Sequence, residues 1–428
     1  MLRALGILPS KLVITMDLNY KIGIVGSSGA GKTTLIMACY MAFRDRMKGI
    51  DIKPKDTKTE GMLQRAEDGF KSCIAHKNTT WTPPKFKNTP DVETYEFLIT
   101  FTACNQTHNI NLTIMDYPGQ MLGNAEFSKE ITPFLLECNA VFLPIPADVL
   151  MQWQINKNNS SEEARNRCTI AREMLNDESA CRAVDNWMAS KARNKQPAQL
   201  FFVPVRCEKY FTDNDAKPTD NSILSSLYSF GKRTLGMLMP ASENELLKAV
   251  DEVYYQQLNY SSGMAECVSV VTTCVDTYGI VEECQMDVRD GLLPDGSKGL
   301  ILEPQFKRRE GMGRIIKIKN AFELLASTFL FQMEKDQQNR FEKIERLKSD
   351  IEKTKARYQE LKKNRTMWES IWGDTPQMKT AQTQINNLSD SLSKTSAHLS
   401  IIKTFINQLN RYYEFNTQRT KIYNPETD

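Results

Sequence analysis

The stretch Gly26-Ser27-Ser28-Gly29-Ala30-Gly31-Lys32-Thr33 matches the phosphate-binding pattern G-x-x-x-x-G-K-[ST]. It follows the apolar run Tyr20–Val25, which predicts a buried strand, and it precedes a helical stretch from Thr33 to about Phe43. Glycines suit a loop that wraps closely around a phosphate, because Cβ atoms would collide with the ligand and backbone N–H groups must point inward. Strand, glycine-rich loop and helix in this order predict a phosphate-binding loop.

The parts of this loop have separate expected roles in binding a nucleotide. Lys32 is expected to reach the β and γ phosphates, and Thr33 to offer its hydroxyl to Mg²⁺. The positive N-terminal end of the following helix points at the same phosphates. We therefore predict that Gly26 through Thr34 bind the nucleotide and that Lys32 also acts in catalysis. An ordinary glycine-rich turn between a strand and a helix is the alternative interpretation.

Composition sets limits on the kind of protein. The chain of 428 residues is too long for one compact core and suggests two or three domains. Its 55 Lys and Arg against 52 Asp and Glu give a formal charge of +3, so the overall charge provides no direct support for nucleic acid or an anionic membrane as partner. Ten cysteines without a C-x-x-C pair favour reduced thiols in the cytoplasm over zinc ligands or a disulfide framework.

Membrane insertion is not expected. No apolar run approaches the ~20 residues that span a bilayer, so no transmembrane segment is predicted. Arg3, Pro9 and Lys11 interrupt the N-terminal apolar stretch, and the phosphate loop follows almost at once, so we expect no cleavable signal. Contact of this short segment with a membrane surface stays open.

Between Tyr20 and about Met333, strand-like and helical runs alternate, which indicates an α/β fold with a mainly parallel sheet. The polar cluster Cys104–His108 joins two of the strands as an antiparallel hairpin, so we predict one antiparallel edge strand. The expected strands are Lys21–Val25, Thr94–Phe101, Ile110–Met115, Ala140–Ile145, Leu200–Val205 and Cys267–Val271.

Several inserts enlarge this domain, which we place at residues 1–333. They lie at about 49–90, 155–197, 212–262 and 285–312. Capping-box spacing of Ser160 with Glu163, and of Ser242 with Glu245, predicts helices in the second and third inserts. Pro294-Asp295-Gly296 predicts a tight turn in the last one. Partner binding and structural padding are both open roles for them.

The chain changes character after Met333. Apolar residues step by alternate threes and fours from Ile344 to Leu361 and again from Ile385 to Tyr413, which are two heptad stripes. We predict a helical coiled-coil hairpin over residues 334–415, followed by a polar tail over 416–428. Pairing of these helices with a partner protein or a second copy, and packing of both on the α/β domain, are alternatives. Trp368 and Trp372 at the bend either form an interaction surface or close the end of the hairpin.

A second motif carries the chemistry. The strand Ile110–Met115 runs into Asp116-Tyr117-Pro118-Gly119-Gln120, a D-x-x-G sequence followed by glutamine. Asp116 is expected to hold Mg²⁺ directly or through water. Gly119 would offer its backbone N–H to the γ-phosphate, and Gln120 falls where a side-chain amide can orient the attacking water. An accidental turn after a strand is the alternative.

Together the two motifs resemble the P-loop GTPases of the Ras-like and translation-factor class, whose D-x-x-G is often followed by such a glutamine. The usual ATPases commonly place a Glu after the Asp as general base, whereas this chain has Tyr117 there. The resemblance covers roughly Tyr20 to Cys274, and it implies binding of GTP and Mg²⁺ and hydrolysis of GTP.

That class selects guanine with [NT]-K-x-D after a strand, and here the corresponding residues are Val205-Arg206-Cys207-Glu208. The resemblance implies that Arg206 packs on the base in place of the lysine and that the longer carboxylate of Glu208 binds the N1 and N2 hydrogens. Val205 departs from the pattern because it has no polar side chain. The alternative is that Arg206 and Glu208 form an ordinary surface pair. Thr272-Thr273-Cys274 matches the family's Ser-Ala pair after the last strand poorly.

The family also uses a threonine that closes on Mg²⁺ through its hydroxyl. The candidates are Thr57, Thr59, Thr79, Thr80, Thr82 and Thr89, and we favour Thr89 because it lies just before a strand. The whole segment from Gly49 to Pro90 is long and rich in Lys, Thr and Pro, which suits a loop that orders around a bound triphosphate. Plain flexibility is the alternative.

The long segments between the two motifs resemble the bacterial double-GTPase or conflict-system GTPases, and a role in antiphage defence follows from that analogy alone. The expected protein is a cytoplasmic GTPase that is slow until a partner or self-association assists it. Two alternatives remain. One is a nucleotide-gated scaffold in which the heptad helices carry the function, and the other is an ATP-dependent motor or nucleoside kinase.

Overall fold

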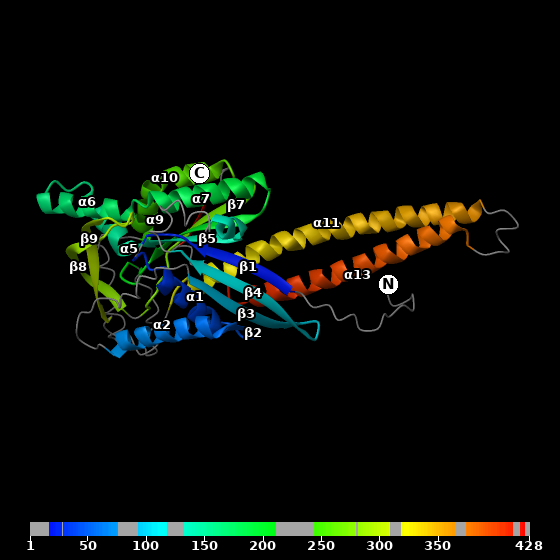
Figure 1. Ribbon diagram of the computed structural model, residues 1–428, viewed down its shortest axis with the longest axis horizontal. Helices are drawn as coiled ribbons and strands as arrows, with labels where there is room; N and C mark the ends of the chain where they lie inside the picture. The colour runs from blue at the N-terminus through cyan, green and yellow to red at the C-terminus, as the bar shows by residue number, and fades with distance from the viewer. Residues whose placement is uncertain are drawn as a thin grey trace, which may run out of the picture.

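The computed structural model describes residues 17–27, 29–75, 93–117, 132–210, 243–279, 281–308, 318–364, 374–413 and 420–423 (Figure 1). Its centre is an eight-stranded sheet in the order β10-β7-β6-β5-β1-β4-β3-β2. Strands β4, β1, β5, β6 and β7 run parallel to one another. The strand bounds are β1 Asp17–Ile24, β2 Ile50–Pro54, β3 Glu93–Ala103, β4 Gln106–Asp116, β5 Ala140–Pro146, β6 Ala198–Val205, β7 Val268–Thr273 and β10 Thr420–Tyr423.

The mainly parallel α/β sheet is confirmed, but the prediction of a single antiparallel edge strand is wrong. Strand β3 does pair antiparallel with β4 through the predicted hairpin, yet β2 covers its outer side and is itself antiparallel to β3. At the opposite edge, β10 pairs antiparallel with β7. Both missed strands are short and lie at edges, where few apolar residues are needed.

The central strands are buried on both faces. Every residue of β5 and β6 is buried, as continuous apolar strands in a covered parallel sheet require. Successive side chains point to opposite faces, so Phe142 and Phe201 enter one apolar layer while Val141 and Phe202 enter the other. The first layer is completed by α1 (Lys32–Arg46) together with the long C-terminal helices, and the second by the helices inserted around β5, β6 and β7.

The inserted helices are α5 Ala147–Asn156, α6 Glu162–Leu175, α7 Glu178–Arg193, α9 Glu243–Val253 and α10 Tyr255–Ser262. Side chains cap the first turns of α6 and α7, whereas no side chain caps α5 or α10. The cap of α6 is Ser161, not the predicted Ser160, because the Ser161 hydroxyl accepts from the amide of Ala164 at 3.2 Å. Asp177 caps α7 in the same way, accepting from Ala180 N at 2.9 Å. The second predicted cap, Ser242, lies outside the described residues.

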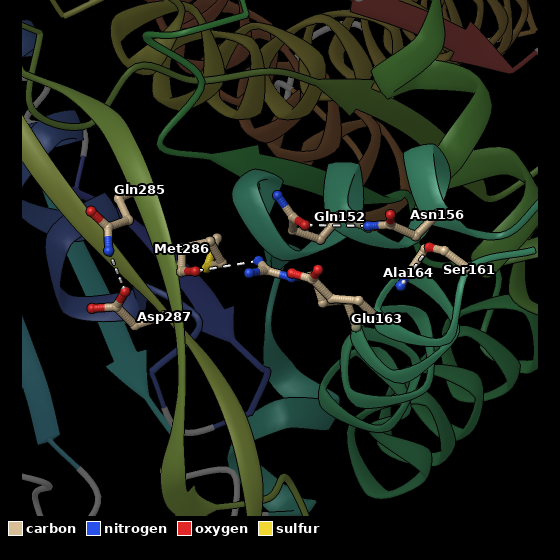
Figure 2. A network of polar contacts seen from close by, with 9 residues as sticks. Gln152, Asn156, Ser161, Glu163, Ala164, Gln285, Met286 and Asp287 are labelled. Carbon is tan, nitrogen blue, oxygen red and sulfur yellow. Dashed lines mark hydrogen bonds and ion pairs between the residues drawn. The ribbon is translucent and has the colours of Figure 1, made fainter. Parts of the chain in front are cut away.

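A two-stranded hairpin of β8 (Val281–Leu292) and β9 (Lys298–Arg308) packs against α6, and the predicted turn at Pro294–Gly296 connects the two strands. Figure 2 shows Glu163 of α6 and Met286 of β8 on the two sides of this contact. Arg167 joins them, because its guanidinium pairs with Glu163 at 3.3 Å and donates to the carbonyl of Met286 at 3.3 Å. The hairpin is therefore fixed to the helical layer.

The segment 49–90, predicted to be a loop, is not one over residues 50–75. It contains β2 and then α2 (Thr57–Ala75), whose first turn is held by Asp56. The Asp56 carboxylate accepts from the amide of Thr59 at 2.7 Å and from its hydroxyl at 3.0 Å. The Thr59 hydroxyl in turn accepts from the amide of Glu96 at 3.0 Å, which makes this threonine a structural residue.

Two long helices, α11 (Ala321–Lys363) and α13 (Pro376–Asn410), lie side by side and run in opposite directions. Ile344, Ile351, Thr395 and Leu399 of the two heptad stripes are buried, so each helix covers the other. Their distal halves extend away from the sheet (Figure 1). Helix α11 begins well before residue 333, so no break in the chain separates the predicted helical unit from the α/β part. Trp368 and Trp372 lie outside the described residues, and no helix within them is long and apolar enough to cross a membrane.

The proximal halves of these helices belong to the core. Phe405 of α13 packs against Phe101 of β3 with ring centroids 4.7 Å apart and the rings tilted by 59°, and it also contacts Phe329 of α11 edge-on at 6.3 Å. Phe43 of α1 contacts Phe322 and Phe329 of α11 at 5.6 and 6.0 Å. The helix that begins at the phosphate loop therefore packs directly on the long helix α11.

Residues after α13 return to the sheet. The expected polar tail includes β10, whose Tyr423 donates from its hydroxyl to Asp251 of α9 and whose Lys421 pairs with the same carboxylate at 3.2 Å. Both ends of the helical pair are thereby attached to the α/β part.

Replacing Phe405 with alanine tests whether the helical pair belongs to the core. Phe405 is fully buried, so we expect Phe405→Ala to lower the free energy of unfolding by about 3–5 kcal/mol through lost transfer energy and a cavity. Phe341→Ala on α11 is the matched control, because its side chain is 52% exposed. Urea unfolding of both variants is the measurement, and equal effects would contradict this account.

Candidate functional site

The phosphate loop joins the carboxyl end of β1 to α1 at the point where the strand order reverses. After β1 the chain builds β2, β3 and β4 on one side and then crosses to β5, β6 and β7 on the other. Open α/β sheets bind ligands at the carboxyl edge beside such a reversal. The loop therefore lies where this architecture places a ligand.

Two glycines of the loop adopt the left-handed backbone conformation, with φ of 78° at Gly29 and 91° at Gly31. Other residues are strained there, which is the physical reason for glycine at both positions. Gly31 precedes α1, and no side chain caps that helix end, so its first amides point into the loop without a side-chain acceptor. An anion suits this end of a helix. Ser28 lies outside the described residues.

Lys32 lies inside the loop. Its ammonium donates to the carbonyl oxygens of Gly26 and Ser27, both at 2.9 Å. Burial lowers the pKa of Lys32, while the charges of Asp116 and Asp177 act in the opposite direction. A buried ammonium held by neutral carbonyl oxygens is a strong site for an anionic oxygen.

Thr33 connects the loop to the end of β4. Its hydroxyl donates to Asp116 Oδ2 at 2.8 Å, and Asp116 lies opposite Ile24 at the end of β1. Burial raises the pKa of Asp116, the charge of Lys32 and the bond from Thr33 lower it, and the charge of Glu93 raises it again. A hydroxyl and a carboxylate side by side are the oxygen donors that Mg²⁺ prefers, so the predicted pair fits this metal.

Three predicted residues of the γ-phosphate side, Thr89, Gly119 and Gln120, lie outside the described residues. Tyr117, the residue after Asp116, is described and points into the core rather than toward the loop. Its ring lies beside Gly23 and Phe134, and its buried hydroxyl has no hydrogen-bond partner among the described residues.

The loop after β6, which contains Val205–Glu208, lies beside the phosphate loop. A Cβ atom added to Gly31 would come within 3.1 Å of Val205 Cγ2. Arg206 has a left-handed backbone with φ of 63°, and its guanidinium pairs with Asp148 Oδ1 at 2.7 Å. Asp148 is fully buried at the start of α5. Asp148 holds Arg206 in place, and no motif in the sequence pointed to this partner.

Glu208 is buried and faces the loop after β7. Its Oε1 accepts from the backbone amides of Tyr278 and Gly279, the latter at 3.0 Å. Burial and the nearby charge of Asp276 raise the pKa of Glu208 to about 7, and the two amides act against them. Arg206 and Glu208 thus have separate partners and do not form the surface pair considered above. A base would have to compete with these amides for the carboxylate.

The loop after β7 is tied to the start of α11. The side-chain amide of Asn320 donates to the carbonyl of Cys274 at 3.2 Å and to the Thr273 hydroxyl at 3.4 Å. The amide of Asp276 donates to the carbonyl of Lys319 at 3.2 Å. The loop after β7, which is expected to lie beside the nucleotide base, is therefore bonded to the residues that precede α11. Sequence alone did not indicate this connection.

Comparisons with known proteins add little. No family model and no curated protein matches the chain. Among solved structures the chain is similar to the crystal structure of Sup35 complexed with GMPPNP, with 12% identity and a TM-score of 0.25 over 63% of this chain. The match spans 41% of that chain's length. The strand order and the geometry of the phosphate loop define the fold.

The raised pKa of Glu208 predicts a pH dependence of stability. Because the folded pKa of about 7 exceeds the ordinary value of 4.5, protonation stabilises the fold at low pH, and this contribution is lost as the pH rises through about 7. The loss is about 3 kcal/mol in the free energy of unfolding. Glu208→Gln keeps an acceptor for the two amides and is expected to remove that pH dependence, whereas the exposed Glu266→Gln leaves it unchanged. Urea unfolding at pH 5 and 8 gives the change in the free energy of unfolding between these two pH values. The same change in wild type and Glu208→Gln would contradict the assignment.

Proposed function

We propose that this protein is a GTPase with a P-loop fold that binds GTP and Mg²⁺ at the carboxyl edge of β1, β4 and β6. The observation that carries the proposal is the arrangement of Lys32, Thr33 and Asp116. A buried ammonium, an uncapped helix end and a hydroxyl–carboxylate pair converge at the point where the strand order reverses. These groups complement a triphosphate with its metal.

The roles follow from the positions. Lys32 and the amides at the start of α1 neutralise the phosphates, while Thr33 and Asp116 hold the metal. Mg²⁺, when bound, supplies charge that neutralises the developing negative charge on the β and γ phosphate oxygens. Gln120 is assigned the orientation of the attacking water from its place after D-x-x-G. Thr89 is assigned the role of the threonine that closes on Mg²⁺, because it lies just before the strand in the sequence.

Guanine is the proposed base. Arg206 bonds to Asp148 and follows Val205, which lies beside Gly31 of the phosphate loop, and these contacts support its proposed role of stacking on the base. Glu208 lies on the same loop, and binding of guanine N1 and N2 would replace its bonds to the amides of Tyr278 and Gly279. In this proposal the Glu208 carboxylate binds either the purine or the backbone amides of the loop after β7.

We further propose that nucleotide state acts on the helical pair. The start of α1 carries the phosphate contacts, and Phe43 and Arg46 at its other end contact α11 through Phe322 and Glu323. On the base side, Asn320, the residue immediately before α11, donates from its side chain to Thr273 and Cys274 at the end of β7. These two connections also support the second candidate function, a nucleotide-gated scaffold in which hydrolysis is secondary. Either form suits a cytoplasmic protein that acts through a protein partner or a second copy.

Side-by-side titration with fluorescent GTP and ATP analogues tests the proposed ligand. We expect tight binding of the GTP analogue with Mg²⁺ and negligible binding of the ATP analogue. Lys32→Ala is expected to abolish binding because it removes the buried ammonium, and Lys58→Ala, an exposed lysine of α2, serves as the control. Tight ATP binding with negligible GTP binding would overturn the assignment to guanine.

Turnover is expected to be slow in the isolated protein. Among the residues that the structure describes, no arginine bonds into the phosphate loop, and an arginine finger from a partner adds about 10³ to 10⁵ in rate. Phosphate release measured over a range of protein concentrations should therefore show more turnover per protomer as self-association increases, or on addition of a partner. Many turnovers per second at every concentration would contradict this expectation.

A further inference from the structure

A second carboxylate lies beside the proposed metal site. Glu93 is the first residue of β3 and lies directly opposite Asp116, the last residue of β4. Directly opposed residues of an antiparallel pair point to the same face of the sheet, with Cβ atoms about 4.5–5.5 Å apart. Because β3 begins where β4 ends, both carboxylates are at the edge that carries the phosphate loop.

Tyr95 holds Glu93 in this position. It lies two residues further along β3, hence on the same face, and its buried hydroxyl donates to Glu93 Oε2 at 3.1 Å. Tyr95 also lies close enough to Thr33 and Asp116 for these residues to influence the pKa of its hydroxyl, which burial raises. The four side chains of Thr33, Glu93, Tyr95 and Asp116 therefore form one cluster.

Two opposed carboxylates are unfavourable without a cation. Like charges directly opposite in a sheet repel, and the burial of Asp116 strengthens that repulsion. The charge of Lys32 lowers the pKa of Asp116, but its ammonium donates its described hydrogen bonds to the carbonyl oxygens of Gly26 and Ser27. Among the described residues, the Asp116 side chain accepts a hydrogen bond only from Thr33. A divalent cation beside both carboxylates would relieve the repulsion.

We propose that Glu93 is a second carboxylate of the Mg²⁺ site, acting with Thr33 and Asp116, and that Tyr95 is its positioning residue. The inference rests on the proposed function, since Mg²⁺ in nucleotide sites is commonly bound through one or two carboxylates together with the phosphates. It adds to the D-x-x-G and phosphate-loop ligands a residue from β3, the strand that follows the segment expected to close on the triphosphate.

The competing explanation is that Glu93 serves only as a hydrogen-bond acceptor for Tyr95. Glutamine at position 93 keeps that acceptor and removes the charge, so Glu93→Gln separates the two. Glu96→Gln is the matched control, because residue 96 is on the same strand but faces the other side of the sheet.

If Glu93 binds the metal, Glu93→Gln has two opposite effects on the full chain: the metal-free protein becomes more stable, and Mg²⁺ binds more weakly. In EDTA without nucleotide, Glu93→Gln is expected to raise the unfolding temperature, since one of two repelling charges is gone. In a titration with the fluorescent GTP analogue, the Mg²⁺ concentration that gives half of the tightening of binding is expected to rise on the order of tenfold. Tyr95→Phe keeps both charges and is expected to shift the Mg²⁺ requirement without raising the unfolding temperature.

An unchanged Mg²⁺ requirement in Glu93→Gln, with wild-type protein binding the analogue, would overturn the inference and leave the proposed function standing. Failure of wild-type protein to bind the analogue would instead refute the proposed function. In that case Mn²⁺ binding without nucleotide, followed by electron paramagnetic resonance, decides the inference. Weaker Mn²⁺ binding by Glu93→Gln than by Glu96→Gln supports the carboxylate site, and equal binding overturns it.

Discussion

The hydrogen bond from Thr33 to Asp116 joins the start of α1 to the end of β4, and the arrangement of the site depends on it. It links the phosphate loop, which follows β1, to the neighbouring strand β4. Asp116 is buried there, and leaving a buried polar group without its hydrogen bond costs about 1–3 kcal/mol. Beside this pair, Lys32 donates to carbonyl oxygens of the loop, and Glu93 lies opposite Asp116 in the pairing of β3 with β4. One polar contact thus aligns the groups that a metal-bound triphosphate needs.

The helical pair follows from the same packing. Helix α1 is buried along most of its length, and α11 is what covers its apolar side, through Phe322 and Phe329. The two long helices are therefore not a separate unit attached by a linker. Helix α1 contacts α11 directly, while β10 and Asn320 hold the two ends of the helical pair on β7 and the loop after it.

Sequence reasoning succeeded where the signal is local. The strands β1, β3, β4, β5, β6 and β7 were predictable because each is an apolar run bounded by turn residues, and the phosphate loop because its glycines have one physical reason to be there. It missed β2 and β10, since Asp51 and Lys53 interrupt one short edge strand and Lys421 the other. It also missed Glu93 and Asp148, because their partners depend on strand pairing and on contacts between residues far apart in the chain. Glu208 shows the same limit: its amide partners lie some seventy residues away in the chain.

A crystal structure of the protein with Mg²⁺ and a non-hydrolysable GTP analogue tests the central claim most directly. The account predicts the triphosphate in the loop over residues 26–33, with the Lys32 ammonium moved from the carbonyl oxygens of Gly26 and Ser27 to the phosphates. It also predicts the metal beside Thr33 and Asp116. An analogue bound elsewhere, or a Lys32 that keeps its two carbonyl partners while the analogue is bound, would contradict the account.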